Sequence, residues 1–173
     1  MSDKSPTHNI NIFVFVAFWI VLFGSIVYLF YRWHEINVGG IQEVIDNKTK
    51  KEVVIRMDSS NYYRANGTIN NLSVNFIIDT GANSVAIPNW LAKKAGLKSL
   101  RQINVQTAGG NRIGYITRIK ELTVGPIKLY NIRALIMDDD AKYVLLGMSA
   151  LRKLELRQRD DYLVLIQHIT TIK

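Results

Sequence analysis

Asp79, Thr80 and Gly81 are the residues whose types and order most clearly offer chemistry. They follow directly on residues 72–78, whose apolar side chains alternate in the manner of a strand with a buried face. An ionised carboxylate at the end of a buried strand is unfavourable unless it has hydrogen-bond or charge partners. Asp79 is therefore either a residue that caps a turn or an acid that is kept for catalysis.

A second motif, Val-Leu-Leu-Gly, lies downstream at residues 144–147 and is followed by a short helical pattern over residues 148–154. The Asp79-Thr80-Gly81 motif resembles the active-site motif of aspartic proteases. Residues 144–147 resemble the hydrophobic strand that crosses behind the catalytic loop in that family. Two ordered motifs are much harder to obtain by chance than one, so the chain resembles the retropepsin-like, single-domain aspartic proteases, close to bacterial membrane-anchored members.

This resemblance implies that two copies of the chain form one active site, since each retropepsin-like subunit supplies a single Asp-Thr-Gly. Asp79 would be the catalytic acid of a homodimer that hydrolyses peptide or protein substrates. Thr80 would bond across the dimer, Gly81 would let the backbone approach substrate, and Ala82 would complete the active-site loop. Structural support behind the loop would come from Leu145, Leu146 and Gly147.

A glycine-rich hairpin tip lies between the alternating segments 103–107 and 113–119. In the aspartic protease family, a hairpin in this place is the flap that closes over substrate. The resemblance therefore implies a substrate-binding role for the tip residues Ala108, Gly109, Gly110 and Asn111. An ordinary surface turn is the alternative, and composition does not separate the two.

The sequence departs from retroviral members at two places. Asn83 stands where those proteins commonly carry an acid, and Met148 and Ser149 stand in place of an Arg-Asn pair. The Asp–Arg structural pair of those relatives is therefore not expected from these positions.

Residues 12–31 contain no charged side chain and are long enough, at roughly 30 Å of helix, to cross a bilayer. A cleaved signal peptide and a buried core helix are the alternatives. We expect a tail at residues 1–11, a transmembrane helix at 12–31, a polar linker at 32–51 and a protease domain at 52–173. The lipid bilayer is thus an expected partner through residues 12–31.

The orientation of this helix has two interpretations. Flanking Lys and Arg residues are more numerous after the helix, which favours a cytosolic domain, but this rule loses force for long translocated domains. The resemblance to bacterial membrane-anchored proteases favours a single-pass inner-membrane protein with a periplasmic domain. We expect the periplasmic arrangement, with the cytosolic one as the alternative.

Many short strands with turn signals predict an all-β domain after the apolar helix. Asn70 and Asn71 predict a tight hairpin, and Pro88 and Gly96 bound a short helix. The expected fold is a closed retropepsin-like β-barrel with one or two short helices.

Composition excludes several other functions. The chain has no cysteine and its three histidines lie far apart, so neither a metal site nor a cofactor is expected. Residues 138–140 are three aspartates without the pattern of a calcium loop. The net charge of +8 is scattered and accompanies no nucleic-acid-binding motif.

The sequence thus predicts a membrane-anchored aspartic endopeptidase that activates water with an Asp dyad formed across a homodimer. Two alternatives remain open. One is a non-catalytic, membrane-anchored binding module with a pepsin-like fold. The other is a basic interaction domain in which Asp79 only caps a turn.

Overall fold

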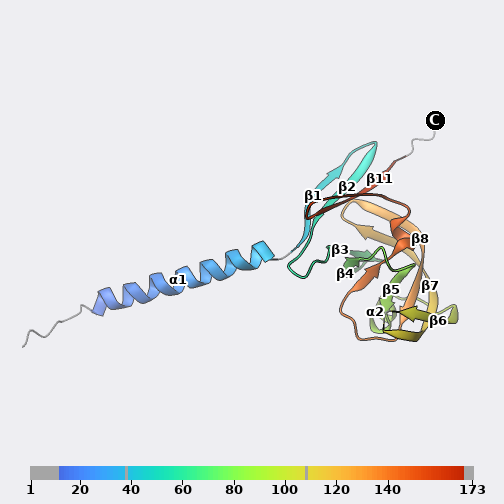
Figure 1. Ribbon diagram of the computed structural model, residues 1–173, viewed down its shortest axis with the longest axis horizontal. Helices are drawn as coiled ribbons and strands as arrows, with labels where there is room; N and C mark the ends of the chain where they lie inside the picture. Colours follow the sequence, from blue (N-terminus) through green and yellow to red (C-terminus); the bar gives the residue numbers. More distant parts are fainter. Residues whose placement is uncertain (1–11, 38, 108, 170–173) are drawn as a thin grey trace, which may run out of the picture. The chain divides into compact units, whose positions relative to one another are not determined.

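The computed structural model describes residues 12–37, 39–107 and 109–169, so the predicted tail at residues 1–11 and Ala108 lie outside the described residues. The chain divides into two units, Met1–Val38 and Gly39–Lys173. Figure 1 shows the helix of the first unit and the strands of the second. Each unit is described by itself.

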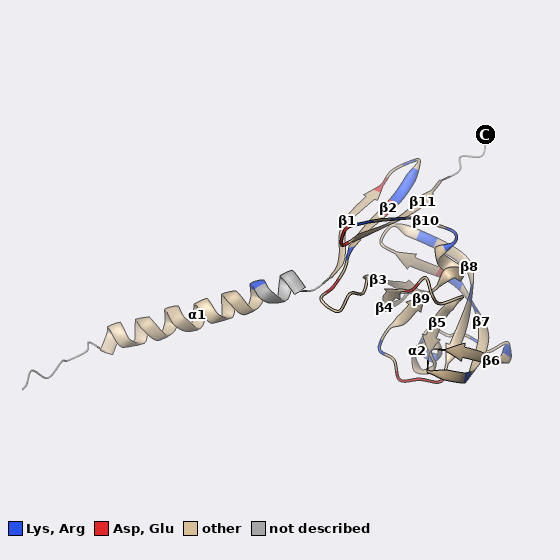
Figure 2. Ribbon diagram, viewed as in Figure 1, with Lys and Arg blue, Asp and Glu red and all other residues tan. Residues whose placement is uncertain are grey.

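The first unit is the helix α1 (Ile12–Asn37). Its stretch Ile12–Arg32 is long and apolar enough to cross a membrane, and none of that window is buried. Arg32 is the first charged side chain along the helix (Figure 2). The absence of burial argues against a core helix, while a membrane anchor and a signal sequence both satisfy these criteria.

The segment predicted as a polar linker, residues 32–51, has regular structure instead. The helix α1 continues to Asn37, the strand β1 (Gly40–Asp46) follows, and β2 already begins at Lys50. β1 forms because it pairs antiparallel with β2 and places Ile41 against the hydrophobic core. The sequence did not indicate this strand, because its residues are largely polar and a register shift between Ile41 and Glu43 breaks its alternation.

The second unit is built from two sheets and two short helices. One sheet has the strand order β1-β2-β11-β10, and the other has the order β3-β4-β9-β5-β8-β7-β6. β3 also pairs with β7, so the strand pairings of the larger sheet return to β3. The remaining elements are β2 (Lys50–Arg56), β3 (Arg64–Ile69), β4 (Leu72–Ile78), β5 (Val85–Pro88), α2 (Asn89–Lys94), β6 (Arg101–Thr107), β7 (Gly110–Val124), β8 (Ile127–Met137), β9 (Val144–Leu146), α3 (Met148–Leu151), β10 (Glu155–Arg159) and β11 (Tyr162–His168).

This architecture confirms the predicted all-β fold with short helices after an apolar N-terminal helix. The hairpin at Asn70 and Asn71 is as predicted, because both residues have positive φ angles of 47° and 69° and Ile69 pairs with Leu72. The strand β8 runs without a break from Ile127 to Met137. Asn131 interrupts its alternation with a φ of 57° but does not end the strand.

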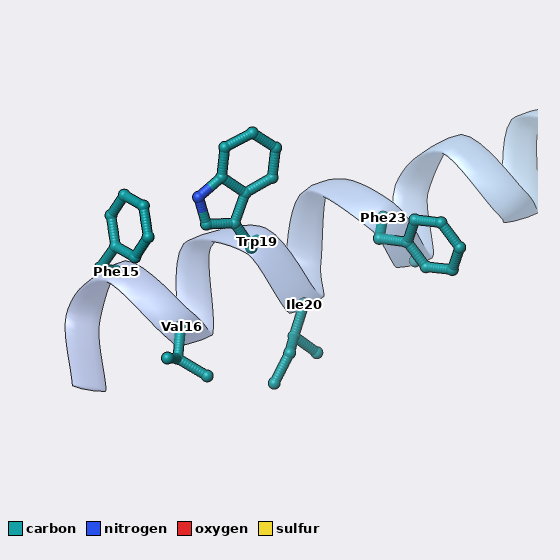
Figure 3. A pocket seen from close by; sticks show the side chains of 6 residues that line it. Phe15, Val16, Trp19, Ile20 and Phe23 are labelled. Carbon is teal, nitrogen blue, oxygen red and sulfur yellow. The ribbon is translucent and has the colours of Figure 1, made fainter. Parts of the chain in front are cut away.

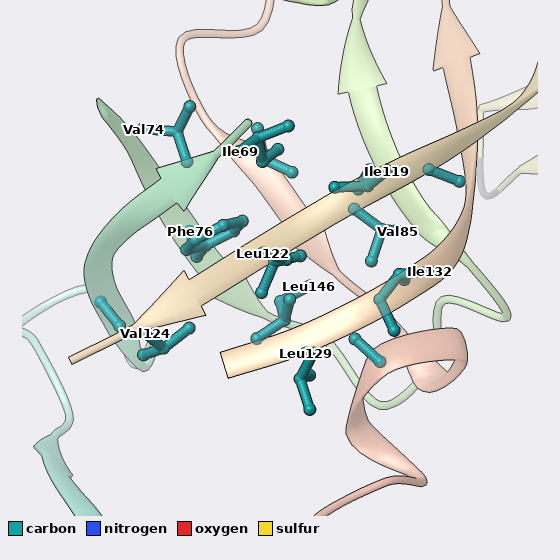
Figure 4. Close-up of a cluster of buried hydrophobic side chains, with 14 of the residues drawn as sticks. Ile69, Val74, Phe76, Val85, Ile119, Leu122, Val124, Leu129, Ile132 and Leu146 are labelled. Carbon is teal, nitrogen blue, oxygen red and sulfur yellow. The ribbon is translucent and has the colours of Figure 1, made fainter. Parts of the chain in front are cut away.

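One hydrophobic core joins the two sheets. Phe76, Leu122 and Leu146 from the larger sheet are fully enclosed, and Ile55 and Leu165 from the smaller sheet belong to the same cluster. Figure 4 shows the side chains of the larger sheet converging between the strands. Each such side chain stabilises the fold by about 1.5–3 kcal/mol through its removal from water. The strand β4 that leads to Asp79 is thereby held by its own buried residues.

Candidate active site

Asp79 is the first residue after β4, at the point where that strand leaves the core. β4 lies parallel to β9, with Ile78 beside Leu146, and the Asp79 N–H donates to the Leu146 carbonyl at 3.2 Å. Phe76 and Ile77 are buried, whereas Asp79 is half-buried. The structure therefore places a carboxylate at the rim of a well-packed strand.

The loop after Asp79 folds back on the carboxylate. Oδ1 of Asp79 accepts a hydrogen bond from the Gly81 N–H at 2.9 Å, and the Asp79 carbonyl accepts one from the Ala82 N–H at 3.3 Å. Among the described residues, neither Oδ2 of Asp79 nor the exposed Thr80 hydroxyl has a hydrogen-bond partner. One carboxylate oxygen thus fixes the turn and the other is left for a further interaction.

Gly147 lies where β9 passes closest to this loop. A Cβ at this position would lie only 2.4 Å from the Ser84 carbonyl oxygen and 2.6 Å from that of Ala82, so only glycine fits. The next residue, Met148, donates its N–H to the Ala82 carbonyl at 2.8 Å. Residues 145–147, predicted as structural support, therefore lie directly against the loop that carries Asp79.

Ser149 is a buried polar residue that sequence reasoning noted only as a departure from the family. It is 5% exposed, and its hydroxyl accepts from the Val85 N–H at 3.0 Å and donates to the Arg133 carbonyl at 2.8 Å. It therefore ties α3 to β5, at the end of the Asp79 loop, and to β8. A serine two residues after the motif glycine is the signal that could have found it.

An Asp–Arg pair does lie beside the site, formed by residues that the sequence did not single out. The side chain of Asp58 is 9% exposed and pairs with Nε of Arg64. Its Oδ1 accepts the N–H groups of Ser60 at 2.8 Å and Tyr62 at 2.9 Å. The guanidinium of Arg64 also lies 5.5 Å from the ring centre of Tyr62 and 5.9 Å from that of Tyr143.

This ion pair lies next to the strand end that carries Asp79. Arg64 pairs with Ile77 across β3 and β4, and the Tyr63 carbonyl accepts a hydrogen bond from the Ile78 N–H at 2.9 Å. Burial of Asp58 favours the neutral carboxyl and would raise its pKa. The hydrogen bonds from Tyr62, Arg64 and Ser60, with the positive charge of Arg64, outweigh burial and lower the pKa below its ordinary value.

The predicted flap is the hairpin of β6 and β7, and its tip is tighter than expected. Thr107 pairs with Gly110, and the Thr107 hydroxyl donates to the Gly110 carbonyl at 2.7 Å. Gly110 and Asn111 therefore belong to β7 rather than to a loop, and only residues 108 and 109 connect the strands. Ile113 near the tip is 49% exposed.

The predicted site residues thus fall into two groups. Residues 79–82 and 145–147 are brought together by the pairing of β4 with β9, near one end of the larger sheet. The hairpin residues lie on the outer strand β6 and on β7, and β7 also pairs with β3, the neighbour of β4. Among the described residues, no hydrogen bond or ion pair joins the two groups.

Within residues 12–37, 39–107 and 109–169, no group of three or more His, Cys, Asp or Glu side chains could hold a metal ion. An apolar hollow lies on α1, lined by Phe15, Val16, Trp19, Ile20, Phe23 and Gly24 (Figure 3). It has no acid or base near it, so it is a feature of the helix surface and not of the Asp79 site.

Known proteins that resemble this chain establish its family. The family model described as "gag-polyprotein putative aspartyl protease" matches residues 65–153, just over half of the chain. The chain belongs to this family. The matched range contains both motifs on which the resemblance in the sequence rests.

Two curated relatives are uncharacterised proteins. One, encoded in the cobV 5' region of Sinorhizobium sp, is 30% identical over 119 residues, which cover 66% of this chain and 51% of the relative. The chain therefore spans about half the length of that relative. The other, from Rickettsia prowazekii (strain Madrid E), is 24% identical over 163 residues, which cover 88% of this chain and 70% of the relative.

A solved structure shows the same fold. The crystal structure of a retropepsin-like aspartic protease from Rickettsia conorii matches with a TM-score of 0.58 and 22% identity, covering 74% of this chain and 97% of that one. The fold is that of the retropepsin-like aspartic proteases, as the sequence predicted.

Proposed function

We propose that this chain is a membrane-anchored aspartic endopeptidase whose active site is completed by a second copy of the chain. The observation that carries the proposal is the setting of Asp79. Its Oδ1 is bonded to the Gly81 N–H at 2.9 Å, while Oδ2 has no partner among the described residues. A carboxylate held in this way is oriented by its own loop and still has an oxygen for a water molecule.

The proposed dimer follows from the number of acids. Peptide hydrolysis by this class of chemistry needs one carboxylate to accept a proton and one carboxyl to donate a hydrogen bond. Each chain supplies Asp79 alone, and Thr80 and Gly81 beside it are exposed. A two-fold axis next to this loop would bring two Asp79 side chains together and would give each Thr80 hydroxyl a partner.

Two facing carboxylates repel each other when both are ionised, so the pair would hold one shared proton. The charged Asp79 would take a proton from water as the water oxygen attacks the peptide carbonyl carbon. The protonated Asp79 would donate a hydrogen bond to the developing oxyanion. Breakdown of the tetrahedral intermediate, with a proton delivered to the leaving nitrogen, gives a carboxylic acid and an amine.

The β6–β7 hairpin is proposed as the cover of this site. A Cβ at Gly109 would meet only the Thr107 hydroxyl at 3.8 Å and the Arg112 guanidinium at 3.9 Å, and Ile113 offers an exposed apolar side chain near the tip. A hairpin that closes over the bound peptide would exclude water and position the carbonyl. Residues 108–111 would then contact the substrate.

The helix α1 is proposed as a single-pass anchor in the inner membrane, with the second unit in the periplasm and a cytosolic location as the alternative. Its apolar, unburied surface over Ile12–Arg32 supports anchoring. Reporter fusions at Lys173 test the orientation. An active alkaline phosphatase fusion supports the periplasmic location, and an inactive one beside an active cytosolic reporter contradicts it.

The alternative function is a binding module in which the acid is structural. The hydrogen bond from the Gly81 N–H to Asp79 favours it, because that bond would fix the turn without any catalysis. Full-length protein in detergent micelles, assayed on a peptide library beside Asp79→Asn, separates the two functions. Hydrolysis by the wild type that Asp79→Asn lacks supports the endopeptidase, and equal hydrolysis by both proteins contradicts it.

A further inference from the structure

The connection between the helix α1 and the β-domain is very short. α1 ends at Asn37 and β1 begins at Gly40, which leaves two residues between them. Two residues span at most about 7 Å when fully extended. The apolar stretch ends at Arg32, so the rest of α1 adds only about 8 Å of helix. If α1 is an anchor, the domain begins within roughly 20 Å of the hydrocarbon of the bilayer.

The point of attachment is packed into the domain and is not a loose end. A Cβ at Gly39 would lie 2.6 Å from the Asp58 nitrogen and 2.7 Å from the Arg56 carbonyl oxygen, so the Gly39 backbone runs directly against that segment. Gly40 then pairs with Arg56 in the first register position of β1 and β2. The domain therefore cannot move away from its tether by freeing these residues without losing native contacts.

The attachment point also lies on the side of the fold that carries the candidate site. The Asp58 N–H, against which Gly39 packs, donates to the Tyr62 carbonyl at 2.9 Å. The neighbouring Tyr63 carbonyl accepts from the Ile78 N–H at 2.9 Å, and Asp79 is the next residue. In Figure 1 the segment between β2 and β3 passes close to the beginning of β1. One packing contact and two backbone hydrogen bonds thus connect Gly39 to the end of the strand that precedes Asp79.

We infer that this protease acts on peptide segments that lie close to the surface of its own membrane. This inference rests on the proposed function, and it adds the substrate class: extended juxtamembrane segments of proteins anchored in the same bilayer. The short tether keeps the start of the β-domain within roughly 20 Å of the bilayer hydrocarbon and raises the local concentration of such segments around the domain. Hydrolysis adds water across the peptide bond and leaves the membrane-anchored fragment with a new terminus.

Proteoliposomes containing the full-length protein and one anchored model substrate test the inference. The substrate carries a cleavable sequence, chosen from a soluble peptide that the enzyme hydrolyses, separated from a transmembrane helix by a proline-rich spacer. Spacers of about 5 and about 30 residues hold that sequence at about 15 Å and about 90 Å. The wild type is expected to cleave the near sequence at least about tenfold faster than the far one.

The matched variant has a proline-rich insertion of about 20 residues directly after Asn37, which would raise the domain by about 60 Å. The insertion lies before Gly39 and leaves the packed attachment point intact. The preference for the near substrate should be lost or reversed in this variant, while hydrolysis of the soluble peptide stays unchanged. That unchanged rate shows that the variant is folded.

The outcomes separate the inference from the proposed function. Equal cleavage of near and far substrates by the wild type, or an unchanged preference after the insertion, overturns the membrane-proximal substrate class and leaves the protease function in place. Absence of hydrolysis of any soluble peptide by the wild type overturns the proposed function, and this inference with it.

Discussion

The Asp79 loop and the β6–β7 hairpin are held in the fold in very different ways. The loop is bonded to β9 at Leu146, to its own turn at Gly81 and to the start of α3 at Met148. The hairpin is formed by the outer strand β6 and its neighbour β7, and among the described residues its tip has one side-chain hydrogen bond, from the Thr107 hydroxyl to the Gly110 carbonyl. The Asp79 loop is therefore held by neighbouring elements of the fold, whereas the hairpin tip is held by the hairpin's own residues.

The largest loss of stability is expected from Gly147→Ala, in the segment that supports the Asp79 loop. The new Cβ would meet two carbonyl oxygens at 2.4 and 2.6 Å, and backbone atoms cannot yield as a flexible side chain can. We expect a loss of at least about 3 kcal/mol in the free energy of unfolding, measured by urea denaturation. The matched control is Gly109→Ala at the hairpin, where the nearest atom to the Cβ lies at 3.8 Å. An equal loss in both variants would contradict the distinction between the two regions.

Ser149→Ala should weaken the support of the loop by a smaller amount. It leaves the buried Val85 N–H and the Arg133 carbonyl without the partner that the hydroxyl provides. We expect a destabilisation of about 1–3 kcal/mol in thermal or urea unfolding. Ser73→Ala, on the exposed side of β4, is the control and should change stability by less than about 0.5 kcal/mol. A Ser149→Ala protein as stable as this control would contradict the claim that the Ser149 hydroxyl supports the loop.

Asp58→Asn should destabilise the segment beside the site in a pH-dependent way. Because the pKa of Asp58 is lower in the folded protein than in the unfolded chain, its charge contributes stability above the unfolded pKa. That contribution is lost as the pH falls through the folded pKa. We expect a difference of about 1–2 kcal/mol between wild type and variant at neutral pH, shrinking below about pH 4 in a series of urea titrations. A difference that grows on acidification would contradict this sign.

The smallest effect is expected at the hairpin tip, where Thr107 can be compared with Thr117 on the same strand pair. Thr107 donates to the Gly110 carbonyl at the exposed tip, and Thr117 donates to the Lys98 carbonyl at 2.8 Å from a position that is 1% exposed. Thr107→Val should cost less than about 0.5 kcal/mol, with faster amide exchange near the tip, whereas Thr117→Val should cost about 1–2 kcal/mol. Equal effects in unfolding and exchange experiments would mean that the tip is as firmly held as the base.

The sequence predicted the elements that depend on local pattern. The strand before Asp79, the strand at residues 144–146 and the hairpin at Asn70 and Asn71 follow from alternation and turn residues, and the structure has each of them. The retropepsin-like fold followed from two short motifs, and the matched family model confirms it. The roles of the individual site residues stay predictions.

The parts that were missed depend on contacts between distant segments. The strand β1 was expected as a linker, because its pairing with β2 and its register shift are not visible in its composition. The Asp58–Arg64 pair and the hydroxyl of Ser149 take their importance from burial, which the chain reaches only after folding. The predicted hairpin loop, residues 108–111, was too long, because Gly110 and Asn111 are turn-forming residues that this fold places in a strand.

A mixing experiment with Asp79→Asn tests most directly whether two chains share one active site. The asparagine Oδ1 can still accept the Gly81 N–H, so the variant should fold and should pair with the wild type. Peptide hydrolysis is then measured at fixed total protein while the wild-type fraction is varied. If each site needs two Asp79 carboxylates, activity follows the square of the wild-type fraction, and an equal mixture retains one quarter of it. Activity proportional to the wild-type fraction, or full activity of Asp79→Asn alone, would contradict the shared site.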